Sequence, residues 1–511
     1  MGSSVVVSTV GFLKGVLAAS YFGTSEDVDS YFVALLLPDL ATRFALSGFF
    51  TFVPLFAAER SRSAEAAWRA AGKMLTLWLA LLSLVAVAGA TFSRELLPLI
   101  ARGFEGQQLQ DTVLMCRILF LMTASVGIAE ILALPLIAQR RFLSATASQV
   151  SFQVSSTAFL VTFHAWGISS LVWGMVFGGF VQLLAICIGL GKDRQHLRLD
   201  FDPRNPVVRR MVRLTVPTYV GNAGAQLNGI VNRGFASLLA AGAVSSIQYA
   251  YMLTEAPVTL LANSATRALF PFMSTQYAEG GRRARANVNR ALFTIAVLFA
   301  PIALGTYLIA TPLVQCLFER GTFDSRSTAM TAGALKFYAP SILALALSRL
   351  MVGAFSAQQD TATPMRAGLV RVAINALLCY ALVSRMGHLG IALANTVAEF
   401  VKCVLLTALL WRTFPGDEAV AMFRPYLRLL PPLAGMALVV SVMKREFLIG
   451  MGSWPLDTLL LVAVVLAGAL AYLGGLSLFC RQELDFYRDI IREHVRLPAG
   501  LGRLAPFRVR P

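Results

Sequence analysis

One apolar stretch of the chain contains residues that lipid would penalise. Residues 29–54 are apolar and long enough to cross a bilayer, yet they include Asp29, Asp39, Arg43 and two interior prolines. Each of these costs free energy in hydrocarbon, so we expect the segment to face a watery cavity. Residues 244–273 repeat its proline pattern 217 to 219 residues later. This spacing predicts a chain built from two related halves.

The repeat extends beyond these two stretches. Three further pairs keep an offset of 218 or 219 residues: Gly23 with Gly242, Arg102-Gly103 with Arg320-Gly321, and Ala138-Gln139 with Ala357-Gln358. Each repeat has six crossings, which is an even number. Both halves should therefore insert in the same orientation, related by an axis along the membrane normal.

The composition is that of a polytopic membrane protein. Of the 511 residues 57% are hydrophobic and 14% are charged, against about 25% charged in a soluble domain. Using about 20 residues as one span, we predict an all-α protein with about fourteen crossings. They fall at 3–23, 28–56, 73–92, 111–138, 143–164, 168–190, 213–240, 244–274, 290–318, 328–355, 364–384, 389–411, 426–444 and 456–479.

These crossings define two pseudo-symmetric six-helix lobes followed by two C-terminal helices. The predicted divisions are an N-lobe at 1–190, an interlobe linker at 191–212, a C-lobe at 213–412, the last two crossings at 413–480 and a tail at 481–511. The second part of the linker is either an interfacial amphipathic helix on an anionic leaflet or a solvated connection.

The distribution of basic residues predicts the orientation. With the N-terminus in the cytoplasm, 27 basic residues fall in cytoplasmic connections and the tail, and seven fall on the opposite side. This asymmetry predicts that both termini are cytoplasmic. It also explains the net charge of +17 without nucleic acid, for which a basic run with interleaved aromatic residues would be expected.

The sequence contains no recognisable catalytic or cofactor site, which argues against an enzyme. Its six cysteines lie in or beside apolar segments without CxxC spacing, and its four histidines are scattered, so neither a metal site nor a disulfide framework is expected. It has neither a Walker A loop nor a GxGxxG loop. We therefore expect no cofactor.

Basic residues recur at equivalent positions of the two halves. Lys14 and Arg233 are 219 residues apart, as are Arg117 and Lys336. A lipid-exposed charge at mid-bilayer costs about 2.5 kcal/mol or more, so duplicated basic residues predict a shared wet surface, above all for Lys14 and Arg233. The alternative is snorkelling from helix ends, which suits Arg117 and Lys336 best.

A polar stripe is predicted on the seventh crossing. Asn222, Gln226, Gly229 and Arg233 follow the spacing i, i+4, i+7 and i+11, which places them on one helix face. We expect this face to look inward and to contact substrate. Polar residues can also join helix to helix, at about 0.6 kcal/mol each, without touching substrate.

Five acidic or basic positions remain as candidates. Glu130 and Arg349 are repeat equivalents of opposite charge and predict a gate between the lobes, although each could instead pair within its own lobe. Glu255, two residues before Pro257, is a candidate substrate contact together with Arg43. Asp29 either contacts substrate or caps the second helix.

The architecture is typical of the multidrug/oligosaccharidyl-lipid/polysaccharide transporters, and four motifs narrow the resemblance. GFLKGVLAASYFG (11–23), DSYFVALLLPDLATRF (29–44), LFERGTFD (317–324) and AFSAQQDTATP (354–364) together resemble the MurJ/MviN family, the lipid II flippases of bacterial peptidoglycan synthesis. The likeness covers nearly the whole chain. In that family residues like Lys14, Asp29, Arg43, Glu255 and Arg349 occupy the equivalent positions.

The resemblance implies alternating access in the bacterial inner membrane. The lobes would rock about a central cationic cavity that takes the pyrophosphate-sugar headgroup, and the last two helices would extend a groove for the polyprenyl tail. It further implies energy from the membrane potential or a cation gradient, membrane lipids and cell-wall synthesis proteins as partners, and a monomer.

Three family charges are missing from this sequence. Ser8 and Met252 replace arginines and Ser47 replaces an acidic residue, with Arg233 and Arg267 as replacements for the arginines. A flippase for another lipid-linked oligosaccharide is therefore an alternative. A multidrug or cation antiporter would need an acidic, aromatic-lined cavity, whereas the duplicated charges here are basic. A glycosyltransferase or scaffold would need carboxylates clustered on an outer loop, and the predicted outer loops are short.

Overall fold

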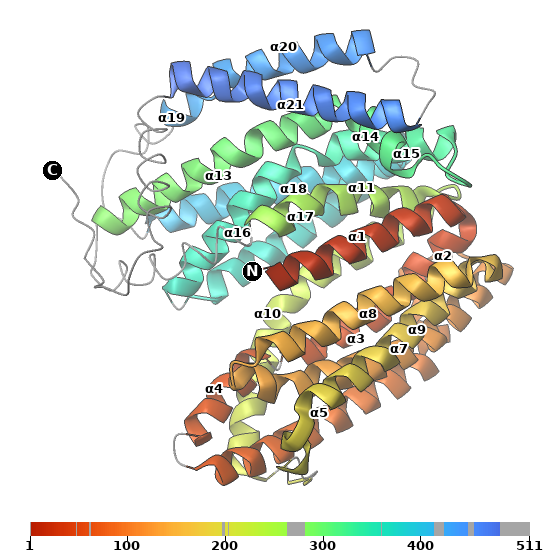
Figure 1. Ribbon diagram of the computed structural model, residues 1–511, viewed down its shortest axis with the longest axis vertical. Helices are drawn as coiled ribbons and strands as arrows, with labels where there is room; N and C mark the ends of the chain where they lie inside the picture. The colour runs from red at the N-terminus through yellow and green to blue at the C-terminus, as the bar shows by residue number, and fades with distance from the viewer. Residues whose placement is uncertain are drawn as a thin grey trace.

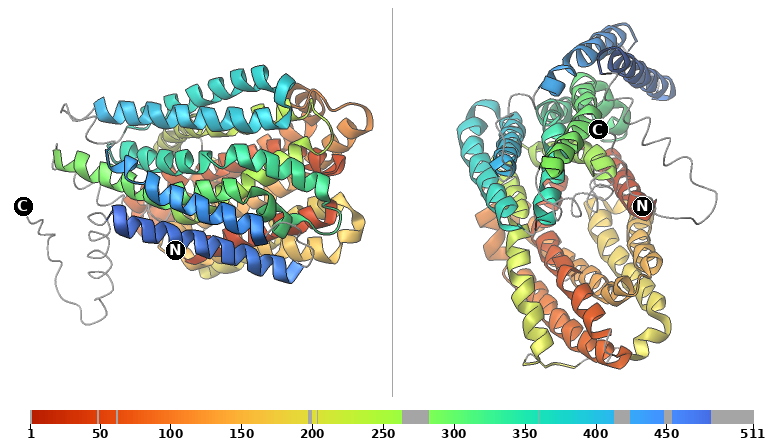
Figure 2. Two further views of the ribbon diagram at one scale, coloured as in Figure 1. Left: turned by 90° about the horizontal axis from the view of Figure 1, so that it is seen from above. Right: turned by 90° about the vertical axis from the view of Figure 1, so that its left-hand side faces the viewer.

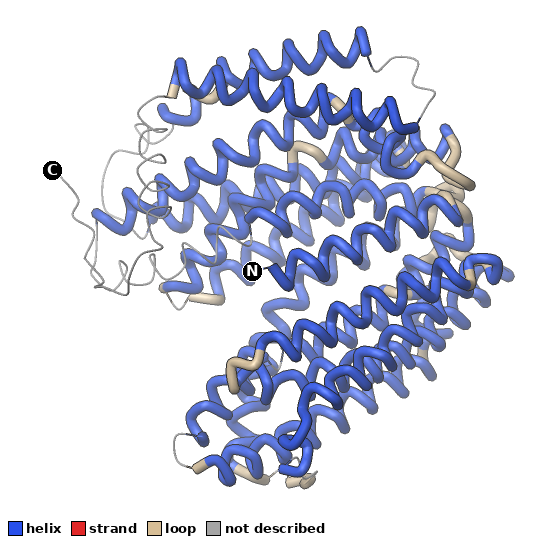
Figure 3. The backbone as a smooth tube through the Cα atoms, in the orientation of Figure 1, coloured by secondary structure: helices blue, strands red, loops and turns tan. Residues whose placement is uncertain are grey.

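The computed structural model describes residues 2–47, 49–60, 63–196, 200–202, 204–262, 282–358, 360–412, 424–447 and 454–480. All regular secondary structure in these ranges is helical (Figure 3). Two bundles share the chain, and they converge toward one end and separate toward the other (Figure 1). Each of the fourteen predicted crossings corresponds to a helix or to a run of consecutive helices, although the eighth is described only as far as residue 262.

The N-lobe contains the first six predicted crossings. Its helices are α1 (Gly2–Phe22), α2 (Glu26–Ala34), α3 (Leu36–Ser47), α4 (Phe49–Arg60), α5 (Ala64–Thr91), α6 (Ser93–Ile100), α7 (Gly106–Ala138), α8 (Phe142–Thr162), η1 (His164–Trp166) and α9 (Ile168–Leu190). The stretch with charges and prolines is therefore three successive helices, α2 to α4, and not one straight span. The short η2 (Gly191–His196) follows.

The C-lobe repeats this order. Its helices are α10 (Pro206–Ala236), α11 (Ala243–Pro257), η3 (Val258–Ala262), α13 (Arg282–Leu308), α14 (Ala310–Phe318), α15 (Ser325–Tyr338), α16 (Ser341–Ala357), α17 (Ala362–Met386) and α18 (His388–Arg412). The second part of the predicted linker is helical, and α10 runs unbroken from Pro206 into the seventh crossing. Its placement on an anionic leaflet stays a prediction.

Two further helices lie outside the repeats. After α19 (Arg424–Leu427), α20 (Leu430–Phe447) and α21 (Trp454–Phe479) pack on each other and on α13 at the edge of the C-lobe (Figure 2). Seven helices of the described chain are individually long and apolar enough to cross a membrane, and α15 with α16 makes an eighth span bent by 47°. The tail predicted at 481–511 lies outside the described residues.

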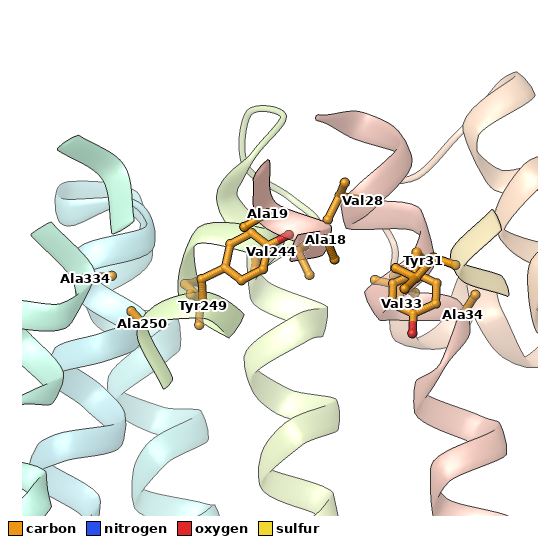
Figure 4. Close-up of a cluster of buried hydrophobic side chains, with 14 of the residues drawn as sticks. Ala18, Ala19, Val28, Tyr31, Val33, Ala34, Val244, Tyr249, Ala250 and Ala334 are labelled. Carbon is orange, nitrogen blue, oxygen red and sulfur yellow. The ribbon is translucent and has the colours of Figure 1, made fainter. Parts of the chain in front are cut away.

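The first helix of each repeat lies between the lobes. α1 packs on α8 of the N-lobe and on α11 and α14 of the C-lobe, whereas α10 packs on α17 and also on α3, α4 and α5. Apolar side chains from both lobes meet in one core where the bundles converge, including Ala18, Val28, Tyr249 and Ala334 (Figure 4). We call this the closed end; it contains the α1–α2 connection.

Equivalent helices of the two halves are interrupted, and the backbone carbonyls left open at the two interruptions accept hydrogen bonds from different donors. α5 and α6 separate near Phe92, and the Arg117 Nε donates to the Ala90 carbonyl at 3.2 Å and to the Ser93 hydroxyl at 3.3 Å. The equivalent break lies between α13 and α14, where Lys444 of α20 donates to the Leu308 carbonyl at 2.8 Å. Carbonyls left open at a helix break need such donors in a membrane. The same hydrogen bond to Leu308 fastens α20 to the C-lobe.

We predict that Arg117→Met lowers the stability of the N-lobe by about 1 kcal/mol, because the helix break loses a charged donor while the long side chain keeps its packing volume. The thermal midpoint of the purified protein in detergent measures this. Arg94→Met on exposed α6 is the matched control, and equal midpoints for both variants would remove the structural role assigned to Arg117.

Candidate functional site

A charged cavity of about 450 Å³ lies between the lobes. It is lined by α3 of the N-lobe and by α10, α11, α15 and α17 of the C-lobe. Five charged side chains line it, namely Asp39, Arg43, Arg233, Glu255 and Arg371. Three guanidinium groups therefore face two carboxylates, and the charged lining is net positive.

The polar stripe of α10 faces this cavity. Gln226, Gly229 and Arg233 all line it, which is the inward direction that their helical spacing predicts, and the side chain of Asn222 lies outside the described residues. The Arg233 Nη2 donates to the Gln248 Oε1 of α11 at 3.2 Å. Arg233 thus has a neutral partner and retains its full positive charge for the cavity.

Arg43, Glu255 and Arg349, which the sequence also predicts, take part in two ion pairs. The Arg43 Nε lies 2.8 Å from the Asp39 Oδ2 one turn away on α3, with about half of each side chain exposed. The Arg349 Nη2 lies 2.9 Å from the Glu255 Oε1. Arg43 and Glu255 line the cavity directly, whereas Arg349 stands behind Glu255 on α16.

Lys14 lies apart from this cavity. Its Nζ is 3.3 Å from the Ser156 Oγ and 3.2 Å from the Met175 Sδ, and it stands over the Phe152 ring at 5.1 Å from the centroid. These contacts place Lys14 against α8 and α9 within the N-lobe. The structure therefore brings Arg233, Arg43, Glu255 and Gln226 together and does not bring Lys14 to them, so its role as a substrate contact stays a prediction.

The predicted gate residues each bond within their own lobe. The Glu130 carboxylate accepts from the Gln149 Nε2 at 3.1 Å and from the Gln182 Nε2 at 2.9 Å, and Arg349 pairs with Glu255. Both arrangements match the alternative to a gate, in which each residue pairs within its own lobe. In this conformation no latch joins Glu130 to Arg349, and their meeting in another state stays a prediction.

Asp29 caps a helix of the opposite lobe. Its Oδ2 accepts from the Gly242 backbone N–H at 2.8 Å and its Oδ1 from the Ser245 N–H at 2.7 Å, at the start of α11. The expectation that it caps its own helix is wrong, because the free N–H groups of α11 lie closer to it across the lobe interface. A carboxylate at a helix N-terminus is stabilised by both hydrogen bonds and the helix dipole.

Backbone contacts complete the closed end. The Thr322 N–H donates to the Ser20 carbonyl at 3.0 Å, and the Thr24 and Ser327 hydroxyl oxygens are 2.8 Å apart. Gly23 has a positive φ of 62°, and a Cβ there would lie 2.6 Å from the Thr322 carbonyl oxygen. Glycine is therefore needed at this position both for its conformation and for the close approach of the two lobes.

Three charged residues in the wall of the cavity were not among the residues predicted from the sequence. Arg371 on α17 and Glu399 and Lys402 on α18 form a buried cluster. Their repeat equivalents are the uncharged Phe152, Gly179 and Gln182, so a search for charges shared by the two halves passes over them. Counting the charges within apolar spans would have found them.

The positions that depart from the family pattern are only partly described. Met252 packs against α1, where a Cβ at Gly15 would lie 2.6 Å from its sulfur, and it does not line the cavity. Ser8 is on α1. Arg267 and the side chain of Ser47 lie outside the described residues.

A second hollow of about 550 Å³ follows the outer edge of the C-lobe. Its walls are α13, α20 and α21, and its lining is almost wholly apolar, with Leu298, Ile309, Met436, Val464 and Leu473 among its residues. An apolar groove of this kind, open along helices at the edge of a membrane bundle, suits a hydrocarbon chain.

We predict that cysteines at positions 24 and 327 form a disulfide under mild oxidation, because the two hydroxyl oxygens are in contact at the closed end. Asp29→Ala should lower the yield several-fold, since α11 loses the carboxylate that ties it to the N-lobe. The number of free thiols after oxidation measures the yield. Asp27→Ala, an exposed neighbour, is the matched control, and an unchanged yield in Asp29→Ala would contradict the cross-lobe cap.

Comparison with known proteins agrees with this architecture. Residues 18–460 match the family described as lipid II flippase MurJ. A relative named lipid II flippase MurJ from Burkholderia cenocepacia is 30% identical over 489 residues, covering 91% of this chain and 93% of the relative. A relative from Bdellovibrio bacteriovorus, named "Probable lipid II flippase MurJ", is 28% identical and covers 93% and 92%.

Solved structures share the fold. One described as lipid II flippase MurJ in an inward closed conformation has a TM-score of 0.78 at 21% identity, covering 96% of this chain and 98% of that chain. An inward-facing multidrug resistance transporter of the MATE family has a TM-score of 0.66 at 13% identity, covering 80% and 93%. The sequence match over most of the chain shows that the protein belongs to the MurJ family.

Proposed function

We propose that this protein carries lipid II, an undecaprenyl-pyrophosphate-linked peptidoglycan precursor, from the cytoplasmic to the outer leaflet by alternating access. The observation that carries the proposal is the interlobe cavity, with three arginines against two carboxylates. Such a transporter makes and breaks no covalent bond. Its task is to lower the barrier for a charged headgroup.

The physical barrier is desolvation. A pyrophosphate and its sugars cannot cross about 30 Å of hydrocarbon without losing water that stabilises their charge. Arg43, Arg233 and Arg371 line one cavity, and guanidinium groups pair with phosphate oxygens through charge-assisted hydrogen bonds. A cavity open to one side at a time offers these bonds in place of water.

The apolar groove accounts for the rest of the substrate. A polyprenyl tail never needs to leave an apolar environment, so it requires only a continuous hydrocarbon surface beside the path of the headgroup. The hollow between α13, α20 and α21 has that character. We assign the tail to this groove and the headgroup to the charged cavity.

We also propose the orientation and state of the structure. With both termini in the cytoplasm of a bacterium, as the basic residues predict, the closed end faces the outside of the inner membrane. The Asp29 cap and the backbone contacts then close the outer side. The structure would be an inward-facing state, ready to accept substrate from the cytoplasmic leaflet.

The experiment that tests this function is rescue of a bacterial strain depleted of its own lipid II flippase, with outward movement of lipid II measured directly. We expect growth and lipid II movement to be restored. Confirmed membrane expression without rescue would favour another lipid-linked oligosaccharide, which the uncharged Ser8 and Met252 make the second candidate.

Arg233→Gln should reduce lipid II transport by about tenfold or more, because a buried cation that pairs with phosphate is replaced by a neutral amide of similar reach. Transport in proteoliposomes made from purified protein measures this. Arg94→Gln, exposed on α6, is the matched control. Wild-type transport by Arg233→Gln would refute the role of the basic cavity.

A further inference from the structure

The cavity wall formed by the C-lobe contains a buried three-charge cluster. The Arg371 Nε lies 2.8 Å from the Glu399 Oε2, and the Lys402 Nζ lies 3.0 Å from the Glu399 Oε1. The side chain of Glu399 is fully buried, while those of Arg371 and Lys402 are 10% and 16% exposed. Of the three, only Arg371 lines the cavity.

The Glu399 carboxylate therefore pairs with two cations, Arg371 and Lys402. A buried carboxylate must keep a partner, because leaving it unpaired in a medium of low polarity is costly. Lys402 bonds the oxygen of Glu399 that Arg371 does not approach. Arg371 can therefore turn from Glu399 toward the cavity while Lys402 keeps the carboxylate paired.

The surroundings of Arg371 offer further hydrogen-bonding groups. The Asn395 Oδ1 accepts from the Arg371 Nη2 at 3.1 Å and from the Asn228 Nδ2 at 2.7 Å, which ties α17 and α18 to α10. The Tyr338 hydroxyl, fully buried on the same cavity wall, has no hydrogen-bond partner among the described residues. A buried hydroxyl without a partner can donate to an anionic group that comes within hydrogen-bond distance.

The repeat shows that the fold itself does not require this arginine. The equivalent position in the N-lobe is Phe152, on α8, and the equivalents of Glu399 and Lys402 on α9 are the uncharged Gly179 and Gln182. The N-lobe packs the same pair of helices around one buried charge from α7, the Glu130 carboxylate, which accepts from Gln149 of α8 and Gln182 of α9. The C-lobe instead buries three charges on the pair itself, and one of them faces the cavity.

We propose that Arg371 binds the pyrophosphate of the substrate, with Glu399 as the positioning residue that holds its guanidinium until the anion arrives and Lys402 as the group that takes over Glu399. This inference rests on the proposed function and adds to it the two residues that control Arg371 and a switching step. The Tyr338 hydroxyl would donate to the same anion.

Binding to the purified full-length protein in detergent tests the proposal. The probes are farnesyl pyrophosphate and farnesol, which share a tail and differ in the pyrophosphate, and tryptophan fluorescence follows binding. Arg371→Gln should weaken farnesyl pyrophosphate binding by about tenfold and leave farnesol unchanged, since one charge-assisted contact is lost. Arg371→Lys should recover part of the affinity. Arg366→Gln, exposed on the same helix, should match wild type.

A second pair of variants tests the switch. Lys402→Met leaves Arg371 as the sole cation on Glu399, so farnesyl pyrophosphate should bind several-fold more weakly although Lys402 does not line the cavity. The double variant Glu399→Gln with Lys402→Met frees Arg371 from both charges, and its affinity should return to the wild-type value or exceed it. If the cluster only stabilised the fold, the double variant would not recover the farnesyl pyrophosphate affinity that Lys402→Met loses.

The outcomes separate the two proposals. Equal farnesyl pyrophosphate affinity of wild type and Arg371→Gln overturns the role of Arg371, while the proposed function stands if wild type still prefers the pyrophosphate to farnesol and moves lipid II. A wild-type protein without that preference overturns the proposed function itself. If Arg371→Gln does not fold, Lys402→Met decides, and wild-type affinity in that variant overturns the inference.

Discussion

Charge is costly in hydrocarbon, and the arrangement of this protein follows from where each charge finds a partner. Glu130 accepts from two glutamines inside the N-lobe, Asp29 accepts from the start of α11, and Glu399 holds two cations. Arg233, and Arg43 with its partner Asp39, lie where a cavity replaces lipid. Hydrogen bonds and ion pairs allow most of these charges to lie within the bundles, and the charges that line the cavity mark the path between the lobes.

The closed end joins the lobes through a shared apolar core and through directional hydrogen bonds. Asp29, the backbone hydrogen bond from Thr322 to Ser20 and close-packed glycines join the lobes at one end. Hydrogen bonds to backbone groups are short and directional, so separating the lobes by a few ångströms would break them together. Such a seam can open as a unit, which is what alternating access requires.

The duplication gives the two lobes a common frame but different chemistry. Lys14 stands over Phe152 in the N-lobe, whereas the equivalent Arg233 shares a cavity with Arg371, the equivalent of Phe152. The C-lobe therefore supplies most of the charged lining, and α3 supplies the rest. An anionic headgroup in this cavity would interact chiefly with the C-lobe, and the apolar groove lies at the outer edge of the same lobe.

Apolar length and the repeat offset determined the helical class, the order of the crossings and the inward face of α10, because these depend on periodicity along one chain. The helix that Asp29 caps, the separation of Lys14 from Arg233 and the pairing of Arg349 with Glu255 were decided only by tertiary structure. Each depends on which helices of two lobes lie side by side, and on which donor comes within hydrogen-bond distance, and neither is encoded in the spacing of residues along the sequence.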